Sequence, residues 1–249
     1  MQGRVLVIAG SDSSGGAGIQ ADIRAITALG GRAATAITAL TAQNIQRVHA
    51  IIGIDPAFVA RQAEAVIEDI GADCIKTGMF YSAEIIDAIC NLMEARAPGI
   101  PWVVDPVMLA TSGTTLLDPR GVKRLVTRVF PHAAVLTPNI PEAERLTGMR
   151  IATDEDMIAA AKRLLEQGPR AILLKGGHRP GDMVTDFLVF KEGVEAFQHP
   201  RIKTSYLHGT GCTLASAIAT GLAQGMTIGL AVARATEYVL NQLRLCNST

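Results

Sequence analysis

The chain has 249 residues, 49% of them hydrophobic and only 4% aromatic, which is enough apolar material for a large core of aliphatic side chains. Lysine plus arginine equals aspartate plus glutamate, at 23 each, and this balance argues against a nucleic-acid partner, which would need a basic surface. The four cysteines have no zinc-binding spacing, and the apolar run after Arg4 is too short for a signal peptide or membrane span. We therefore expect a soluble, cytoplasmic protein with reduced thiols and no membrane partner.

Short apolar runs alternate with longer segments of helical spacing along the chain. The sequence predicts strands at residues 5–9, 33–40, 74–76, 102–105, 135–137 and 171–174. It predicts helices at residues 19–29, 56–70, 83–97, 119–130, 155–167, 213–224 and 227–245. Because continuous apolar strands are typical of sheets covered on both faces, this order predicts an α/β fold with a mostly parallel central sheet between two helical layers.

One segment departs from the alternation. Residues 186–190 and 194–198 flank Lys191, Glu192 and Gly193, a pattern typical of a β-hairpin, so we expect antiparallel edge strands near residues 186–199. The sequence contains no linker, repeat or low-complexity stretch, and we therefore expect a single domain over residues 1–249.

Polar and glycine residues follow the predicted strands. In an open parallel sheet, ligands bind beyond the carboxyl ends of the strands, so these residues indicate where a site would lie. The strand ends supply the glycine-rich residues 10–18, then Thr41, Gln43, Asn44, Lys76, Asp105, Asn139 and Lys175.

The glycine loop after the first strand resembles a dinucleotide fingerprint. Residues 16–21 match the form G-x-G-x-x-A, but no Asp or Glu lies between residues 25 and 54 to hold a ribose hydroxyl. This absence disfavours a dinucleotide site and favours a loop that lines a pocket. The sequence also lacks the G-x-x-x-x-G-K-[ST] pattern, so a phosphotransferase built on this chain must hold phosphate in another way.

A second glycine loop offers that way. Residues 208–213 precede a predicted helix, and glycines at a helix start let backbone N–H groups bind an anion. Cys212 lies in this turn, where we expect its thiol to have a lowered pKa and to act as a base. The alternative is a small buried thiol at the beginning of a tightly packed helix.

Two further motifs each have two interpretations. Asn139 and Glu142 have the spacing of a capping box, and they also suit a metal–phosphate group. Lys175 either neutralises a transferred phosphate or is a solvated loop lysine. The remaining histidines show no ligand spacing, and we interpret them as structural or surface residues: His49, His132, His178 and His199.

Several segments, in this order, resemble the hydroxymethylpyrimidine/phosphomethylpyrimidine kinase family: residues 9–22, 38–44, 76–79, 105–108, 137–143, 174–178 and 208–214. The resemblance covers nearly the whole chain. It implies a ribokinase-like three-layer α/β/α fold and a homodimer. It also implies ATP-dependent phosphorylation of 4-amino-5-hydroxymethyl-2-methylpyrimidine to its monophosphate and then its diphosphate, in thiamine biosynthesis, with Mg²⁺.

The resemblance also implies roles for individual residues. Gln43 is expected to bind the pyrimidine in a pocket lined by Gly10, Asp22, Met79 and Val107. The turn formed by Gly209, Thr210, Gly211 and Cys212 is expected to be the anion hole, with Cys212 at the catalytic position. The residues expected to serve the ATP phosphates are Lys175, Asn139, Glu142 and Gly211, and Asp105 and Glu142 are expected to bind magnesium.

The chemistry of these residue types agrees with that reaction. The Gln43 amide has both a donor and an acceptor, which suits an aminopyrimidine edge. A Cys212 thiolate would accept the proton of the hydroxymethyl group, and the second transfer needs charge neutralisation more than a base because its acceptor is already anionic.

Two other functions stay open from the sequence. One is a pyridoxal-type kinase on the same fold, because pyridoxine also carries a hydroxymethyl group on a planar ring. The other is a pyrimidine-binding sensor without turnover, against which the combination of Lys175, Glu142 and Cys212 argues. The sequence also departs from the family at its end, because members usually continue into a glycine-rich tail that ends near a His-Phe pair, whereas this chain ends at Thr249.

Overall fold

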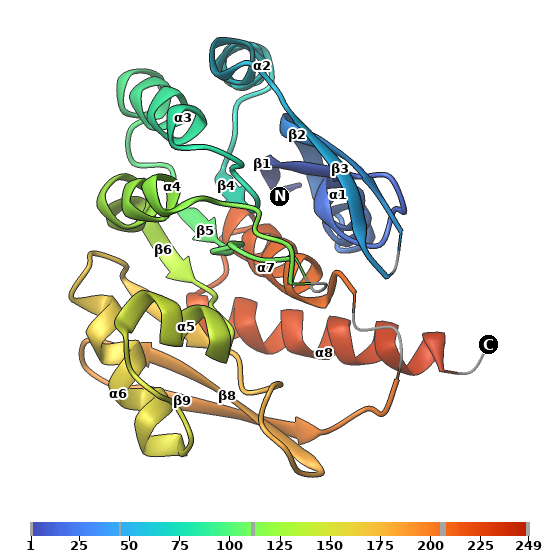
Figure 1. Cartoon of the computed structure of the whole chain (residues 1–249), viewed down its shortest axis with the longest axis vertical. Helices are drawn as coiled ribbons and strands as arrows, with labels where there is room; N and C mark the ends of the chain where they lie inside the picture. The colour runs from blue at the N-terminus through green and yellow to red at the C-terminus, as the bar shows by residue number, and fades with distance from the viewer. Residues whose placement is uncertain (1, 45, 111–112, 205–207, 248–249) are drawn as a thin grey trace.

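A computed structural model describes residues 2–44, 46–110, 113–204 and 208–247. Within them a nine-stranded sheet has the order β3-β2-β1-β4-β5-β6-β7-β8-β9 (Figure 1). The strands are β1 (Arg4–Asp12), β2 (Arg32–Gln43), β3 (Val48–Gly53), β4 (Cys74–Thr77), β5 (Trp102–Val104), β6 (Ala133–Leu136), β7 (Ala171–Leu174), β8 (Met183–Phe190) and β9 (Val194–Pro200). The six central strands, β2, β1, β4, β5, β6 and β7, pair in parallel. Strand β3 at one edge and strands β8 and β9 at the other pair antiparallel.

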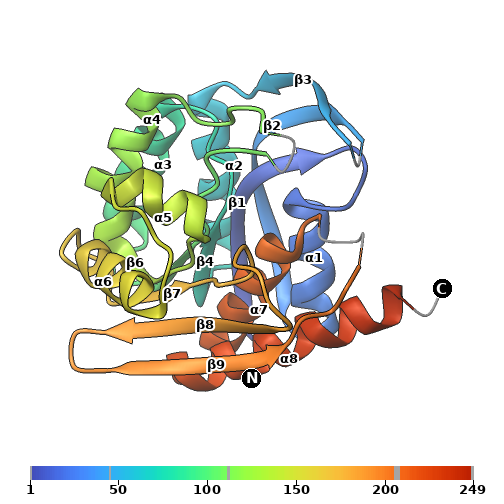
Figure 2. The ribbon, with the colours of Figure 1, turned by 60° about the horizontal axis from the view of Figure 1, so that its bottom comes forward.

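Helices cover both faces of the sheet (Figure 2). One layer contains α2 (Pro56–Asp69), α3 (Ala83–Arg96), α4 (Pro119–Arg124), α5 (Ile140–Thr147) and α6 (Asp154–Leu165). The other contains α1 (Gly18–Ala28), α7 (Thr210–Ala223) and α8 (Ile228–Cys246). The predicted three-layer arrangement is therefore confirmed. None of the helices in the described residues is both long and apolar enough to cross a membrane.

Strand β1 explains why the sheet supports two cores. Successive side chains of a strand point to opposite faces. Leu6 and Ile8 pack into the core under α2 and α3, while Val5, Val7 and Ala9 pack into the core under α1 and α7, and all five are at most 1% exposed. A strand that is buried on both faces has to be apolar without alternation, which is the pattern that predicted it.

The predicted elements are present, and the structure adds two that the sequence did not predict. Strand β3 lies at the sheet edge beside β2, and helix α5 begins directly after Asn139. The predicted helix at residues 119–130 is α4 continued by a π-helical turn, Leu125–Val129, and a 3₁₀ turn, Phe130–His132. The predicted antiparallel hairpin is β8 and β9.

Candidate active site

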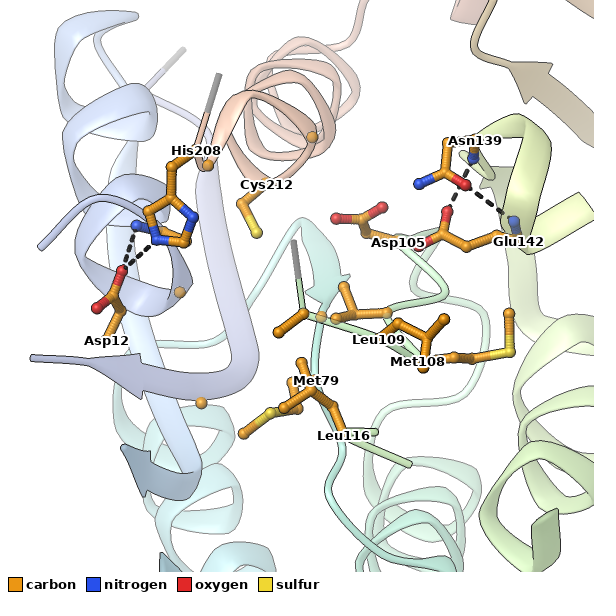
Figure 3. A pocket seen from close by; sticks show the side chains of 18 of the residues that line it. Asp12, Met79, Asp105, Met108, Leu109, Leu116, Asn139, Glu142, His208 and Cys212 are labelled. Atoms are coloured by element: carbon orange, nitrogen blue, oxygen red, sulfur yellow. Dashed lines mark hydrogen bonds and ion pairs between the residues drawn. The ribbon is translucent and has the colours of Figure 1, made fainter. Parts of the chain in front are cut away.

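A cavity of about 640 Å³ lies where the parallel strands end and α7 begins (Figure 3). Because Gln43 and Cys212 both line it, a predicted substrate residue and a predicted catalytic residue share one site. All but one of the predicted site residues line this cavity: Gly10, Gln43, Met79, Asp105, Val107, Asn139, Glu142, Lys175, Gly209, Thr210, Gly211 and Cys212.

Asp22 is the exception, and its predicted place in the substrate pocket is corrected. Its side chain is fully buried behind the wall and does not line the cavity. Its Oδ1 accepts hydrogen bonds from Lys76 Nζ at 2.8 Å and from Ser216 Oγ at 2.7 Å. The buried ammonium of Lys76 needs a carboxylate partner, and this partner turns Asp22 towards β4 and α7 instead of the cavity.

One side of the cavity is apolar. A Cβ at Gly10 would lie 2.5 Å from Met79 Cε, so a glycine at the end of β1 lets the Met79 side chain reach the wall. The apolar side chains that Figure 3 labels on this side are Met79, Met108, Leu109 and Leu116. Such a surface suits the flat face of a heterocycle, while the opposite wall is polar.

The end of β2 is tied to the first glycine loop. Ser13 Oγ donates to the Gln43 carbonyl oxygen at 2.9 Å, and the Gln43 N–H donates to Ser13 Oγ at the same distance. These bonds fix the backbone of Gln43 at the cavity wall. Thr41 also lines the cavity, whereas Asn44 lies in the following turn, where its side chain accepts backbone bonds.

The N terminus of α7 faces the cavity through Gly209, Thr210 and Gly211. Gly209 has φ +81°, which favours glycine, and a Cβ there would lie 2.0 Å from the Gly16 carbonyl oxygen. A glycine cannot cap the helix with a side chain, so the helix begins with backbone groups at the cavity wall. This arrangement has the dipole and N–H geometry of an anion site.

The Cys212 side chain points into the cavity beside Asp105 (Figure 3). Burial raises the pKa of its thiol to about 12, although the Lys76 charge and the Gly18 backbone N–H both lower it. The predicted lowering of the Cys212 pKa is therefore wrong. The loss of water around the thiolate outweighs the helix N terminus and the nearby cation.

Lys175, Asp105 and Glu142 form a charged group on the polar wall. Lys175 Nζ lies 3.3 Å from Asp105 Oδ1. Burial lowers the pKa of Lys175, but the charges of Asp105 and Glu142 outweigh it and raise the pKa overall. Burial raises the pKa of Glu142 to about 7, and Asp105 adds to this rise while Lys175 opposes it.

Asn139 and Glu142 form the predicted capping box at the start of α5. The Asn139 N–H donates to Glu142 Oε2, and the Glu142 N–H donates to Asn139 Oδ1, both at 2.8 Å. Because both residues also line the cavity, the capping role and a ligand role are compatible. The helix cap holds the Glu142 carboxylate at the wall.

The donor set on this wall fits a magnesium ion that is shared with phosphate. No group of three or more His, Cys, Asp or Glu side chains among the described residues is arranged to hold a metal by itself. Magnesium is usually bound by one or two carboxylates together with substrate phosphates and water. Asp105 and Glu142 supply two carboxylates on one wall.

The comparisons with known proteins decide the family. Residues 12–248 match the family model for phosphomethylpyrimidine kinase. The chain belongs to the phosphomethylpyrimidine kinase family. A thiamine biosynthesis bifunctional protein of Geobacter sulfurreducens is 51% identical over 98% of this chain, which spans 50% of that relative's length. A hydroxymethylpyrimidine/phosphomethylpyrimidine kinase of Streptomyces coelicolor is 43% identical over 94% of this chain and 86% of its own length.

A solved structure supports the fold of this phosphomethylpyrimidine kinase family member. Pyridoxal kinase from Staphylococcus aureus, in complex with AMP-PCP and pyridoxal, superimposes with a TM-score of 0.87 at 31% identity. The superposition covers 96% of this chain and 87% of that one. The predicted ribokinase-like fold is confirmed.

The sequence did not single out Asp12 and His208, which join the two glycine loops of this family member. Asp12 Oδ2 lies 2.9 Å from His208 Nε2 and accepts the Ala17 N–H at 2.7 Å. A Cβ at Gly16 would lie 2.4 Å from His208 Cδ2, so a glycine is needed for this approach. The two residues are 196 positions apart, and no local pattern connects them.

The other histidines divide between the cavity and the remainder of the molecule. His178 lines the cavity and is exposed, which agrees with the expected surface position, and partial desolvation lowers its pKa. His132 stacks on Trp102 with ring centroids 5.2 Å apart, as a structural residue would. Sequence spacing could not separate these two cases, because neither histidine has a neighbour at ligand spacing.

Asp12 makes the stability of this phosphomethylpyrimidine kinase family member depend on acidity. Burial would raise the pKa of Asp12, but hydrogen bonds from Ser14, His208 and the backbone outweigh it and lower the pKa to about 2. A lowered folded pKa gives stability that is present above the unfolded pKa near 3.8 and is lost as the pH falls towards 2. We expect this contribution to be on the order of 2 kcal/mol at neutral pH.

The test is urea unfolding of the wild type and Asp12→Asn between pH 2 and pH 7. The difference in unfolding free energy should be largest above pH 4 and should shrink towards pH 2. A matched control is Asp69→Asn, an exposed carboxylate at the end of α2. This variant should show no such trend. A difference for Asp12→Asn that is constant over this range would contradict the prediction.

Proposed function

We propose that the protein transfers the γ-phosphoryl group of ATP to the hydroxymethyl group of 4-amino-5-hydroxymethyl-2-methylpyrimidine and then to the resulting monophosphate. The observation that carries this proposal is the single cavity that contains Gln43, Cys212 and Lys175. The names of the curated relatives in thiamine biosynthesis support the substrate, and the AMP-PCP in the pyridoxal kinase complex supports a nucleotide donor.

In this proposal the pyrimidine ring lies against the apolar side of the cavity. The Gln43 amide offers a donor and an acceptor to the aminopyrimidine edge. Its backbone bonds to Ser13 hold it at the wall, which favours a fixed orientation of the ring. Gly10, Met79 and Val107 complete the surface around the ring.

The first transfer needs a proton acceptor. The hydroxymethyl oxygen forms a bond to the γ-phosphorus, the bond from that phosphorus to ADP breaks, and the hydroxyl proton passes to the Cys212 thiolate. The N–H groups at the start of α7, around Gly211, stabilise the charge on the transferred group. Because the resting thiol has a pKa of about 12, the step depends on cations that favour its ionised form.

The polar wall serves the nucleotide in this proposal. Lys175 neutralises the transferred phosphoryl group, with Asn139 and Gly211 beside it. Asp105 and Glu142 would hold Mg²⁺, which supplies further charge neutralisation at the phosphates. In the second transfer the acceptor is already an anion, so Lys175 matters more than the base.

A pyridoxal-type kinase is the second candidate, and the likeness to the pyridoxal complex favours it. The test incubates the purified protein with Mg-ATP and each heterocycle in turn, and follows phosphorylated products and ADP. Formation of both pyrimidine phosphates supports the proposal, and exclusive phosphorylation of pyridoxal supports the second candidate. Absence of ADP release with any heterocycle would favour a pyrimidine-binding sensor and overturn both.

Gln43→Leu is expected to raise the KM for the pyrimidine by about tenfold or more, because the loss of a matched hydrogen-bonding group costs roughly 1–3 kcal/mol. The KM for ATP should stay unchanged. The measurement is steady-state kinetics with either substrate varied. Gln46→Leu is the matched control, because Gln46 is exposed three residues further along, after the end of β2. An unchanged pyrimidine KM in Gln43→Leu would remove this residue from the proposed pocket.

Three expectations from the sequence stay predictions. They are a single domain over residues 1–249, homodimer formation and a cytoplasmic location.

A further inference from the structure

A second ion pair lies behind the cavity, and the proposed reaction does not use it. Lys76 Nζ and Asp22 Oδ1 are 2.8 Å apart, and both side chains are 0% exposed. Ser216 Oγ donates to the same oxygen at 2.7 Å. The other carboxylate oxygen, Asp22 Oδ2, has no hydrogen-bond partner within the described part of the chain.

The position of this pair relates it to Cys212. Ser216 follows Cys212 by four residues on α7, so the two side chains lie on the same face of that helix. Lys76 lies in β4 directly before the cavity wall, and a Cβ at the wall residue Gly78 would lie 3.1 Å from Lys76 Nζ. The ammonium of Lys76 is therefore held just behind the wall that Cys212 faces.

Fold stability is a weak reason for such a pair. Two charges that are removed from water gain little over apolar side chains of similar volume, because the cost of desolvation offsets their attraction. A fixed cation behind the cavity wall can instead stabilise a negative charge that develops on the cavity side of that wall. Cys212 supplies that negative charge when its thiol ionises.

We propose that Lys76 is a positioning residue for phosphoryl transfer: Asp22, which is anchored by Ser216, holds its ammonium beside Cys212, where it stabilises the thiolate. The catalytic meaning of this inference rests on the proposed function. The ionisation of the thiol is measurable without any turnover.

The groups around the thiol come from several elements. Asp22 on α1 and Asp105 after β5 raise the pKa of Cys212 less than burial does, while Lys76 gives the largest lowering effect and the Gly18 backbone N–H adds to it. Lys175 after β7 also faces Cys212, whose negative charge contributes to the raised pKa of that lysine. Lys76 differs from Lys175 in being fully buried and in pairing with a carboxylate, Asp22, that Ser216 also holds in place.

The test measures alkylation of Cys212 by iodoacetamide, in which the thiolate attacks carbon and iodide leaves. The background is Cys246→Ser, because Cys246 is exposed and would react, whereas Cys74 and Cys90 are fully buried. In this background Lys76→Met is compared with the double variant Lys76→Met/Asp22→Asn. At a fixed pH between about 7 and 10, Lys76→Met should react at least about tenfold more slowly than the parent, as expected for a pKa rise of one unit or more. The double variant should lie between the two, because Asp22 raises the pKa of Cys212 less than Lys76 lowers it.

The double variant separates an electrostatic role from a structural one. It leaves no unpaired buried charge, so a purely structural role predicts that it regains the parent alkylation rate, and that result would overturn the proposal. It also decides the question if Lys76→Met alone fails to fold. Arg4→Met is the matched control, because it breaks the Arg4–Asp73 pair at the opposite end of β1 and should leave alkylation unchanged.

A parallel kinetic measurement links the ion pair to turnover. The double variant should lose more kcat with the hydroxymethylpyrimidine than with its monophosphate, since the first transfer depends more on the thiolate. Equal losses would contradict the positioning role. If the parent protein releases no ADP with either acceptor, the proposed function fails, and the alkylation rates still decide whether Lys76 stabilises the thiolate.

Discussion

Cys212→Ala is expected to lower kcat for phosphorylation of the hydroxymethylpyrimidine by about 10²- to 10⁴-fold, the range that a positioned proton acceptor contributes. Phosphorylation of the monophosphate should fall much less, because its acceptor oxygen carries no proton that must be removed. The Cys212 side chain faces the cavity beside the N terminus of α7, where it would meet the hydroxyl group. The measurement is kcat for each acceptor at saturating Mg-ATP.

The pH dependence of the first transfer gives a second check on Cys212. Burial raises the pKa of this thiol to about 12, so the fraction of thiolate increases throughout the accessible pH range. We expect kcat of the wild type to rise with pH from about 6 to 9, and Cys212→Ala should lose this rise. Cys246→Ala, which removes an exposed thiol at the end of α8, is the control. If Cys212→Ala lost kcat equally for both acceptors, or kept the rise of kcat with pH, a proton-accepting role would be contradicted.

The fold could be predicted because the sheet is buried on both faces. Val5, Val7 and Ala9 face one core and Leu6 and Ile8 the other, which leaves a continuous apolar run that is visible in the sequence. Edge strand β3 has no such signal, because it is largely exposed and includes the polar residue His49. Its position depends on pairing with β2, which is a tertiary contact.

The members of the site could be predicted for a related reason. Parallel strands end at one edge, so residues that follow different strands meet there whatever their separation in sequence. Gln43, Asp105 and Lys175 reach the cavity in this way. Asp22 lies on a helix instead, and the side of the wall that it faces depends on the buried ammonium of Lys76.

The protonation state of Cys212 could not be predicted from local sequence. The glycine turn and the helix N terminus favour a thiolate, but the amount of water around the sulfur depends on the packing of distant segments. The contact between Asp12 and His208 is hidden for the same reason, because it joins loops at opposite ends of the chain. Both the pKa of Cys212 and the Asp12–His208 contact depend on which distant segments pack together, and neither can be read from the residue types nearby in sequence.

Lys175→Met is expected to lower kcat for both transfers by a similar factor, about 10²- to 10³-fold, because both pass through the same charged phosphoryl group. Lys175 Nζ lies 3.3 Å from Asp105 Oδ1, and a Cβ at Gly211 would lie 3.3 Å from the same nitrogen, so the ammonium sits between the carboxylate wall and the start of α7. A cation at this place acts on the donor, which is common to both steps, whereas Cys212 acts on the acceptor, which is not.

The measurement is kcat for each acceptor in Lys175→Met, with Lys162→Met on the exposed face of α6 as the matched control. A loss with one acceptor alone would contradict a role on the phosphoryl group. The comparison with Cys212→Ala separates the two roles within one assay, since a change at the donor affects the two products equally and a change at the acceptor does not. If both variants instead gave the same pattern of losses, Lys175 and Cys212 would act on the same partner in the reaction. The cavity would then not divide into a side for the phosphoryl donor and a side for the acceptor.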